Sequence, residues 1–432
     1  MSANALSASA LSASALTASA RGANAWSANA GAGLRMPPLA ISEFSVVTSL
    51  GPGRARTLAA LREGRSGLAP CTFDAVPFPA YAGEIPELDN SPLEGELAAF
   101  DCRNHRLAAL ALREDGFADA VADARDRHGP ARIGIFLGTS TSGLQQTEIA
   151  YRNRDPKTGL LPPGFDYART QNTYSLARFV RSACDLAGPA FVVSNACAAT
   201  AKVFASAARM IEVGVCDAAV VGGVDTLCAT TLYGFHALGL VAVEPCRPFD
   251  VERCGISIGE AGGFFLLERP NDRHGPETVF FLGFGESSDA YHMSSPHPEG
   301  IGARLAMERA LEAAGLEPAA IDYINLHGTG TPVGDAVEDR AVFDMFGDGT
   351  PCSSTKGFAG HTLGASGAVE AAFCALAIEH GFLPGSPHTR SIDPAFKSAY
   401  VSVGRAARIE RAISNSFGFG GANCSLVLGR AA

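Results

Sequence analysis

The sequence predicts an α/β protein with buried sheets. From residue 39 onward, short apolar runs alternate with helix-like stretches, and this alternation is typical of α/β folds. The helix-like stretch 365–376 is rich in Ala and Gly, which indicates a helix packed closely between two sheets. Each half of the chain also has an apolar strand, a small-residue turn and then an Ala-rich helix. The two turns, 194–200 and 360–367, hint at an internal duplication.

The predicted elements follow one another along the chain. Strands are expected wherever a short apolar run is bounded by turn residues. The runs are 39–47, 132–137, 190–194, 218–222 and 262–268, and then 278–284, 321–326, 350–354, 411–416 and 424–428. Longer stretches between them predict helices at 199–213, 302–314, 334–345 and 365–381.

The first 35 residues differ from the rest of the chain. Residues 1–33 are almost entirely Ala, Ser, Leu, Asn and Gly. They have no basic start, no continuous apolar block and little Arg, so they make a poor secretory signal or transit peptide. We expect residues 1–35 to be a disordered extension, with Met36 as a candidate true start. A helical arm that binds a partner is the alternative.

Composition narrows the class of protein. Of the 432 residues, 47% are apolar and 18% are charged, as in globular proteins, and no apolar run is long enough to span a bilayer. The net charge of -10 argues against nucleic acid as the main partner. Eleven cysteines without CxxC pairs predict reduced thiols in a cytoplasmic enzyme. We expect neither a metal site nor a disulfide framework.

Cys197 is the candidate nucleophile. The apolar run 190–194 leads directly into Asn195-Ala196-Cys197, and a helix-like run begins at Ala198. The thiol is therefore expected at the N-terminus of a helix, where the helix dipole and free N–H groups favour a thiolate. The alternative for this residue is a small, buried structural cysteine.

Two histidines in glycine-rich segments are candidate partners of this thiol. His327 opens His-Gly-Thr-Gly-Thr-Pro-Val-Gly-Asp after a predicted strand, at the sheet edge where sites collect in α/β proteins. His361 lies before an Ala/Gly helix, with Lys356 upstream and Glu370 downstream. A neutral imidazole can accept a thiol proton or donate to an oxyanion. For either histidine alone, a satisfied core residue is the competing interpretation.

Glycines and hydroxyl groups in two segments complete the candidate set. Thr329 and Thr331 follow His327 and offer hydroxyls to an extended polar ligand. The segment 414–423 combines glycines with two phenylalanines. Such a turn can bring a backbone N–H close to a reacting centre while an aromatic ring closes a pocket. A tight hairpin turn is the alternative for this segment.

Over residues 39–430 these motifs resemble the β-ketoacyl-acyl-carrier-protein synthases of the condensing-enzyme superfamily, in the branch of synthases I and II. The resemblance implies a thiolase-like fold: two duplicated α/β halves in five αβαβα layers. We place the halves at 36–270, with the nucleophile, and at 271–432, with both histidines. The resemblance also implies a dimer, formed with a second copy or with a chain-length factor.

The resemblance implies a role for each candidate residue. Cys197 accepts the acyl group, and His327 and His361 form the histidine pair. Lys356 and Glu370 support the second histidine. The N–H groups of Cys197 and Phe419 form the oxyanion hole, with Phe419 as the gating aromatic. The phosphopantetheine arm is contacted by Thr329 and Thr331, and the stretch 288–292 lies near the entrance.

The implied reaction is a decarboxylative Claisen condensation with malonyl-acyl-carrier protein, without a cofactor. The segments 138–144, 285–292 and 351–356 look most like synthases of aryl polyene and xanthomonadin-type pigment clusters. One departure is Arg253-Cys254-Gly255-Ile256, where the family has Arg-Asp-Gly-Phe, and another is Ala261, where it has Gly. Both put the substrate range in doubt more than the activity.

Other members of the superfamily fit less well. A thiolase would have a second cysteine in the loop 417–421, and a synthase III would pair its cysteine with His and Asn. A non-catalytic chain-length factor would lack the nucleophile that Cys197 provides.

Acyl carrier proteins are acidic, so a basic docking surface is expected on this acidic chain. Arg103 and Arg106 lie three residues apart at the start of a helix-like run, and thus on one face. Matching positions in the family contact the carrier. An ordinary solvated helix face is the alternative.

Overall fold

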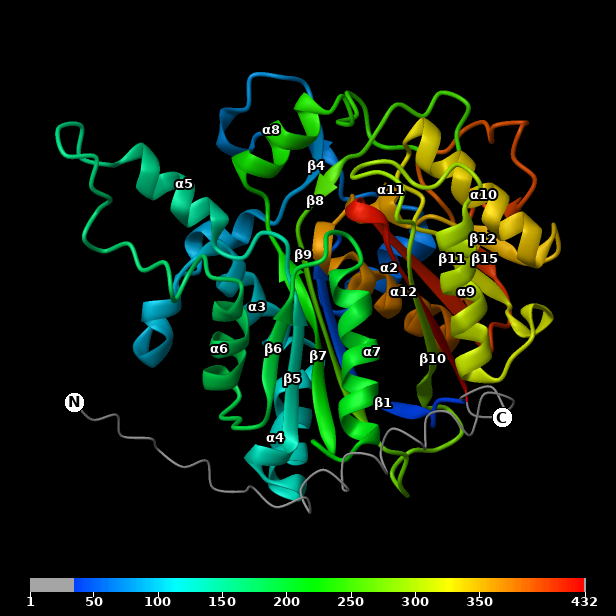
Figure 1. Ribbon diagram of the computed structural model, residues 1–432, viewed down its shortest axis with the longest axis horizontal. Helices are drawn as coiled ribbons and strands as arrows, with labels where there is room; N and C mark the ends of the chain where they lie inside the picture. Colours follow the sequence, from blue (N-terminus) through cyan, green and yellow to red (C-terminus); the bar gives the residue numbers. More distant parts are fainter. Residues whose placement is uncertain (1–34, 431–432) are drawn as a thin grey trace, which may run out of the picture.

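A computed structural model describes residues 35–430 (Figure 1). Its main sheet is one hydrogen-bonded path whose two halves repeat the same strand order, while five short strands outside it form two small separate sheets. The first half runs in the order β1 (Leu39–Thr48), β9 (Ala261–Glu268), β7 (Ala218–Asp225), β5 (Ile133–Gly138), β6 (Ala190–Val193). The second half runs in the order β10 (Val279–Ser288), β17 (Ala422–Arg430), β16 (Arg411–Gly418), β11 (Tyr323–Asn325), β12 (Pro351–Ser353), β14 (Ala399–Tyr400).

Strand directions also repeat between the halves. In the first half, β1–β9 and β9–β7 are antiparallel, whereas β7–β5 and β5–β6 are parallel. In the second half, β10–β17 and β17–β16 are antiparallel, whereas β16–β11 and β11–β12 are parallel. The halves join where β1 pairs with β10, at Leu39↔Phe281 and Ala40↔Phe280. The duplication that the two small-residue turns indicated is thereby confirmed.

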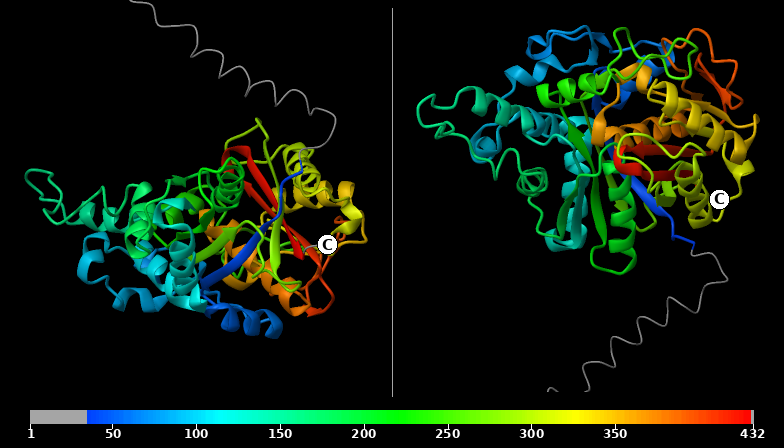
Figure 2. Two further views of the ribbon diagram at one scale, coloured as in Figure 1. Left: turned by 90° about the horizontal axis from the view of Figure 1, so that it is seen from below. Right: turned by 45° about the horizontal axis from the view of Figure 1, so that its top comes forward.

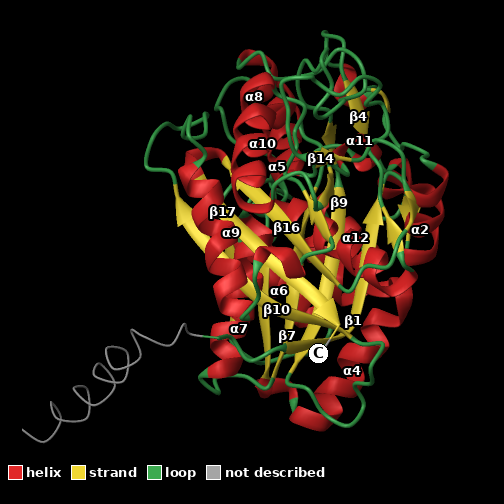
Figure 3. Cartoon of the chain, turned by 90° about the vertical axis from the view of Figure 1, so that its right-hand side faces the viewer, coloured by secondary structure: helices red, strands yellow, loops and turns green. Residues whose placement is uncertain are grey.

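Helices form three layers around these strands (Figures 1 and 3). The middle layer consists of α7 (Ala199–Glu212) and α12 (Ser366–His380), which pack against each other and against strands of both halves. One outer layer covers the first half and the other covers the second. Their main helices are α3 (Arg103–Arg113), α4 (Phe117–His128) and α6 (Tyr174–Ala183) on the first half, and α9 (Ile301–Ala314) and α10 (Pro332–Phe346) on the second. The predicted thiolase-like αβαβα arrangement is thus confirmed.

Alternating side chains explain how each strand serves two layers. In β9, Phe265 joins the central core cluster, whereas its neighbour Phe264 joins the outer cluster of the first half. In β17, Leu426 packs centrally and Val427 packs outward. This period of two is the strand period, and both faces are apolar because both are covered. Helix α12 is buried from Ser366 to Ile378, as expected for a helix between two sheets.

All the predicted strands and helices are present, with shifts at their ends. Strands β7 and β10 extend beyond the predicted ranges, and β11 is shorter. Elements that the sequence did not single out include α2 (Arg54–Glu63), α5 (Leu144–Arg152), α8 (Ala229–Ala237), α11 (Lys356–Ala359) and the short strands β2 (Gly51–Pro52), β3 (Ala69–Pro70), β4 (Tyr81–Gly83), β8 (Ile258–Gly259), β13 (Phe382–Leu383) and β15 (Arg405–Ala406). Figure 2 shows α5 and the loop after it extending from the first half.

Three other predictions concern the chain as a whole. The extension predicted at 1–35 lies outside the described residues except for Arg35. All eleven cysteines lie within the described range and carry free thiols. In residues 35–430, no helix combines the length and apolar character needed to cross a membrane.

Candidate active site

The candidate residues meet where strands of both halves end. Cys197 follows β6 and immediately precedes α7. His327 follows β11, and His361 lies between β12 and α12. Because β6 and β12 are equivalent strands of the duplicated halves, the turns after them bring the thiol and an imidazole to the same point between the two central helices.

A sharp turn presents the Cys197 thiol. Ala196, directly before it, has φ of 44°, a left-handed conformation that a side chain normally disfavours. Gly418 packs against this turn, since a Cβ on Gly418 would lie 3.2 Å from the Cys197 nitrogen. Backbone N–H groups of Phe419 and of Cys197 itself interact with the thiol. These two N–H groups are the predicted oxyanion-hole donors.

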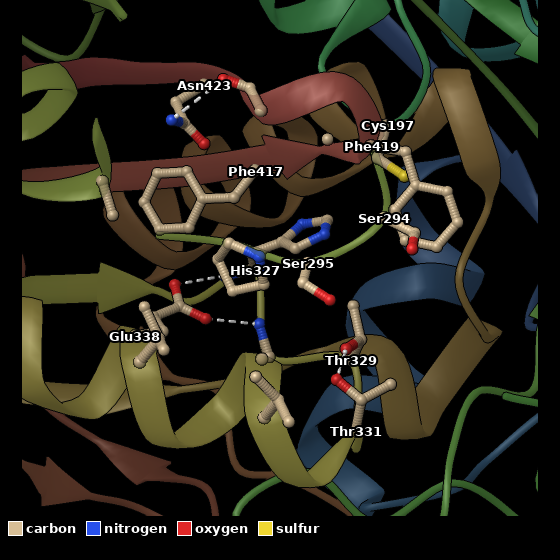
Figure 4. A pocket seen from close by; sticks show the side chains of 18 of the residues that line it. Cys197, Ser294, Ser295, His327, Thr329, Thr331, Glu338, Phe417, Phe419 and Asn423 are labelled. Atoms are coloured by element: carbon tan, nitrogen blue, oxygen red, sulfur yellow. Dashed lines mark hydrogen bonds between the residues drawn. The ribbon is translucent and has the colours of Figure 1, made fainter. Parts of the chain in front are cut away.

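His361 is the direct partner of the thiol. Its Nε2 lies 3.0 Å from Cys197 Sγ, and its Nδ1 lies 3.0 Å from Ser366 Oγ. The His327 ring stands nearly perpendicular to the His361 ring, at 86° with centroids 5.3 Å apart. Figure 4 shows His327 and Cys197 lining one pocket. A thiol and two imidazoles therefore face the same small volume.

Of the two histidines, Lys356 makes polar contacts with His327 and not with His361. Its Nζ donates to the His327 carbonyl at 2.5 Å, lies 3.4 Å from His327 Nδ1 and forms an ion pair with Glu370. An ammonium group can only donate, so this contact makes His327 Nδ1 an acceptor and leaves the proton on Nε2. The resemblance implied that Lys356 and Glu370 support the second histidine, whereas the contacts connect them to the first.

Burial controls the protonation of the site. Burial raises the pKa of the Cys197 thiol to about 11. The charge of Lys356 and the backbone N–H of Phe419 lower that pKa, but their effect is smaller. Burial also holds the pKa of His327 and of His361 well below the usual value, and the nearby Lys356 charge lowers both further. At neutral pH the resting pair is thus a thiol hydrogen-bonded to a neutral imidazole, not the preformed thiolate that the helix N-terminus suggested.

A pocket of about 240 Å³ leads to these groups. Thr329 and Thr331 line it, and their hydroxyls lie 2.9 Å apart (Figure 4). Phe419 lines it beside the thiol, and its ring lies 5.6 Å from that of Phe235. The hydroxyl pair and the aromatic ring lie where an extended polar arm would pass on its way to Cys197.

The structure corrects the predicted docking pair. The Arg103 side chain is only 2% exposed and forms ion pairs with Glu260, at 2.6 Å, and Asp89. Arg106 is held in a bidentate contact with Asp101. The three-residue spacing predicted that both arginines lie on one exposed helix face. At Arg103 that face packs inward, and the buried carboxylate of Glu260 compensates the charge of the arginine. Arg103 is therefore not part of an exposed basic surface.

The thiol and the two imidazoles are also close enough to be considered as metal ligands. One ligand atom from each of Cys197, His327 and His361 lies within 4.8 Å of the others. The adjoining Lys356 ammonium places a positive charge beside this set, which opposes a cation. The arrangement instead suits proton transfer and the stabilisation of an oxyanion.

Four buried polar residues of the site were missed by sequence reasoning. Glu338 accepts the N–H groups of His327 and Gly328, both at 2.7 Å, and burial raises its pKa to about 7. The others hold the site loops: Ser366 at His361, Asp335 at Gly330 and Asp225 at Thr139–Thr141. Asp335 and Glu338 lie three residues apart in the predicted helix that follows the His327 segment, a signal that was available. Asp225 and Ser366 carried no such signal.

Comparisons with known proteins agree with this geometry. Residues 36–273 match the beta-ketoacyl synthase N-terminal domain, and residues 280–390 match the C-terminal domain of the same family. The mitochondrial 3-oxoacyl-[acyl-carrier-protein] synthase of Arabidopsis thaliana is 33% identical, over 90% of this chain and 92% of that protein. The 3-oxoacyl-[acyl-carrier-protein] synthase 2 of Coxiella burnetii is 32% identical, over 91% and 98%.

Solved structures give the same result. The ketosynthase ApeO in complex with its chain length factor ApeC from Xenorhabdus doucetiae has a TM-score of 0.81 and 36% identity, over 91% of this chain and 98% of that chain. The ishigamide ketosynthase/chain length factor has a TM-score of 0.83 and 30% identity, over 92% and 100%. A thiolase-like fold with a buried thiol–imidazole pair defines an acyltransferase of the condensing type. Within that class, the chain belongs to the β-ketoacyl synthase family.

Proposed function

We propose that the protein condenses an acyl group, carried on Cys197, with malonyl-acyl-carrier protein to give β-ketoacyl-acyl-carrier protein and carbon dioxide. The observation that carries this proposal is the 3.0 Å contact between Cys197 Sγ and His361 Nε2, with the His327 ring 5.3 Å from that of His361. One nucleophile and two imidazoles are the groups that acyl transfer and decarboxylation each require.

The first step transfers the acyl group to the sulfur. His361 Nε2 accepts the thiol proton, and the Cys197 sulfur attacks the acyl thioester carbonyl. The tetrahedral oxyanion accepts hydrogen bonds from the N–H groups of Cys197 and Phe419. It collapses by breaking the bond to the carrier's sulfur, which leaves as a thiol after taking the proton from His361. Because burial keeps the Cys197 pKa at about 11, this proton acceptor at hydrogen-bond distance is essential.

The second step uses the imidazoles as donors. His327 carries its proton on Nε2 because Lys356 donates to Nδ1. The Ser366 hydroxyl can accept from His361 Nδ1 or donate to it, so His361 can present an Nε2–H once the sulfur is acylated. Both imidazoles then donate to the malonyl thioester carbonyl as carbon dioxide leaves. The enolate carbon attacks the acyl carbonyl, and the bond to the Cys197 sulfur breaks. The expelled thiolate takes up one proton from solvent, which restores the resting thiol.

Substrate delivery and cellular context complete the proposal. Thr329 and Thr331 contact the phosphopantetheine arm, and Phe419 moves aside for the acyl chain. The partner subunit is a second copy or a chain-length factor, as in the two solved complexes. We place the enzyme in the cytoplasm, in fatty-acid or aryl-polyene-type biosynthesis. Ile256, in place of the family's phenylalanine, lines the pocket and gives it a smaller wall side chain there.

Intact-protein mass spectrometry tests this function. The protein is mixed with a panel of acyl-carrier proteins, and the mass should increase by one acyl group on Cys197. Adding malonyl-carrier protein should remove that group and release β-ketoacyl product.

Cys197→Ser should abolish condensation in a folded protein, because a hydroxyl is a far weaker nucleophile at neutral pH. Cys197→Gln should keep malonyl decarboxylation. Full condensation by Cys197→Ser would overturn the proposal, and the non-catalytic alternative would show no acylation of the native protein.

A further inference from the structure

Helix α8 (Ala229–Ala237) is an apolar helix that the rest of the fold hardly covers. It carries no Asp, Glu, Lys or Arg, and within the described structure only its Leu232 is buried. The ring of Phe78 covers part of it by stacking on His236. Tyr233 remains exposed, as do Leu238 and Val243 directly after the helix. An uncharged, exposed helix is unusual on the surface of a protein and indicates a contact surface.

This helix forms one side of the mouth of the Cys197 pocket. Phe235 of α8 lines the pocket, and its ring lies 5.6 Å from that of Phe419. Leu240, just after the helix, lines the pocket as well. In Figure 1, α8 lies at the same end of the molecule as α10, whose Pro332 and Val333 also line the pocket.

Exposed apolar side chains continue on the other sides of the mouth. Val333 at the start of α10 lines the pocket and is 58% exposed. Met293 is 78% exposed and directly precedes Ser294 and Ser295, which line the pocket. We call this surface the apolar rim, and its members are Tyr233, Leu238, Val243, Met293, Ile301 and Val333.

Several of the arginines beside the rim are paired with carboxylates. Arg247, in the segment after α8, contacts Glu244 at 3.1 Å and Glu252 at 2.9 Å. Arg253 contacts Asp393 at 2.7 Å. Together with the pairing of Arg103 with Glu260 and Asp89, these contacts compensate three nearby arginines by carboxylates, whereas Arg340, within the described residues, contacts only the Pro298 carbonyl. The surface around the mouth is therefore suited to an apolar partner more than to an acidic one.

We propose that the apolar rim docks the carrier protein that delivers the thioester, through an apolar helix face on that carrier. The proposal rests on the proposed function, because a substrate tethered to a protein brings that protein against the mouth of the pocket that leads to Cys197. The rim surrounds that mouth, so the carrier is the partner that covers it during each transfer. Contact through apolar burial, not through a basic patch, distinguishes this docking mode.

Salt dependence tests the docking mode without any substitution. The KM for acyl-carrier protein is measured on the native enzyme from about 50 to 500 mM salt. Apolar contacts are not screened, so the KM should change by less than about twofold or fall. A KM that rises steeply over this range would overturn the proposal in favour of charge-based docking.

Two substitutions test the surface itself. Leu238→Glu and Met293→Glu should each raise the KM for acyl-carrier protein by about tenfold, since each places a charge in an apolar contact. Acylation of Cys197 by a small pantetheine thioester should stay at the native rate. Val213→Glu is the matched control, because Val213 is equally exposed but lies just beyond the far end of α7 from Cys197.

The remaining outcomes also decide the matter. Equal losses on carrier-bound and small thioesters would mean that the rim shapes the pocket, and unchanged kinetics would mean that the rim is not contacted; either overturns the proposal. A change in oligomeric state in Leu238→Glu, measured by light scattering, would assign the surface to a partner subunit instead. Failure of small thioesters to acylate the native enzyme would contradict the proposed function and not the docking mode.

Discussion

At the residue scale, the chemistry of Cys197 depends on its neighbours more than on its position in a helix. The N-terminus of α7 and the Lys356 charge favour a thiolate, but burial outweighs them and raises the Cys197 pKa to about 11. The low pKa of His361 keeps the imidazole neutral, so it is ready to accept a proton. Reactivity therefore arises from proton transfer across the 3.0 Å contact when a substrate arrives.

The Lys356–Glu370 pair predicts opposite effects of two substitutions. The charge of Lys356 lowers the pKa of Cys197, and that of Glu370 raises it. Lys356→Met should therefore slow alkylation of Cys197 by iodoacetamide at pH 8, and Glu370→Gln should speed it. About one pKa unit in either direction would give about a tenfold change in rate. Mass spectrometry of the labelled peptide measures both rates, and changes of the same sign would show that the pair acts through the fold instead.

His327 should be needed for decarboxylation but not for acylation of the thiol. His327 lines the pocket, while the thiol contacts His361. His327→Ala should still accept an acyl group on Cys197 but lose carbon dioxide release by about a hundred- to a thousandfold, the usual cost of one lost donor to an oxyanion. His361→Ala should impair both steps. Decarboxylation at the native rate in His327→Ala would show that the residue has another role.

Residue motifs predicted most of the reacting groups, because these side chains lie in glycine-rich segments directly after apolar strands. Cys197, His327 and His361 do meet, although 164 residues separate His361 from Cys197. Sequence spacing did not reveal that Lys356 contacts His327, since that contact depends on how two strand ends meet. Nor did it reveal that Arg103 is buried, because its partner Glu260 is 157 residues away.

At the element scale, duplication explains why the nucleophile and its base are neighbours. Strands β6 and β12 occupy equivalent places, and each leads to a helix of the middle layer. The N-termini of α7 and α12 therefore converge on the site, one bearing Cys197 and the other following His361. The sequence predicted these strands and helices well because apolar runs and Ala-rich stretches alternate clearly. It did not single out α8, whose apolar residues lack a core-facing pattern.

Asp225, at the end of β7, should hold the thiol turn and the His361 turn in place. Its carboxylate accepts the Ser140 N–H at 2.8 Å and the Thr141 N–H at 2.7 Å. A Cβ on Gly364 would lie 2.8 Å from it, so it packs against the turn after His361. Asp225→Asn replaces one accepting oxygen by an NH₂ group, which cannot accept a hydrogen bond from these N–H groups. It should therefore lower the free energy of unfolding by about 1–3 kcal/mol. Alkylation of Cys197 should slow as well.

Chemical denaturation and the alkylation rate measure these two effects. Thr141→Val is the matched control, since it removes one hydroxyl donor from the same carboxylate and leaves both N–H contacts. It should cost less stability and leave alkylation nearly unchanged. If Asp225→Asn loses stability but alkylates at the native rate, the carboxylate supports the fold without positioning the site.

At the scale of the whole molecule, a buried carboxylate connects elements of the first half at the end opposite the site, next to the β1–β10 junction. Glu268 ends β9, just before the segment that leads into the second half. It accepts hydrogen bonds from Ser42 at 2.6 Å and Arg127 at 2.7 Å, and lies 2.9 Å from His128. These partners come from β1 and α4, so one carboxylate connects three elements where the halves meet.

Acid should weaken this connection. Although burial opposes it, hydrogen bonds from Ser42, Arg127 and His128 lower the pKa of Glu268 to about 2, from an ordinary value of 4.5. A carboxylate whose pKa is lower in the folded state stabilises the protein above pH 4.5. That contribution, about 3 kcal/mol, is lost as the pH falls from 4.5 through 2.

Glu268→Gln should therefore lower the Tm by several degrees at pH 7, and its difference from the native protein should shrink steadily below pH 4.5. Calorimetry of both proteins between pH 7 and pH 3 measures this. Glu410→Gln is the control, because Glu410 pairs with Arg408 on the surface and such exposed pairs contribute little. A Tm difference that stays constant across this range would mean that Glu268 acts through its shape and packing and not through its charge.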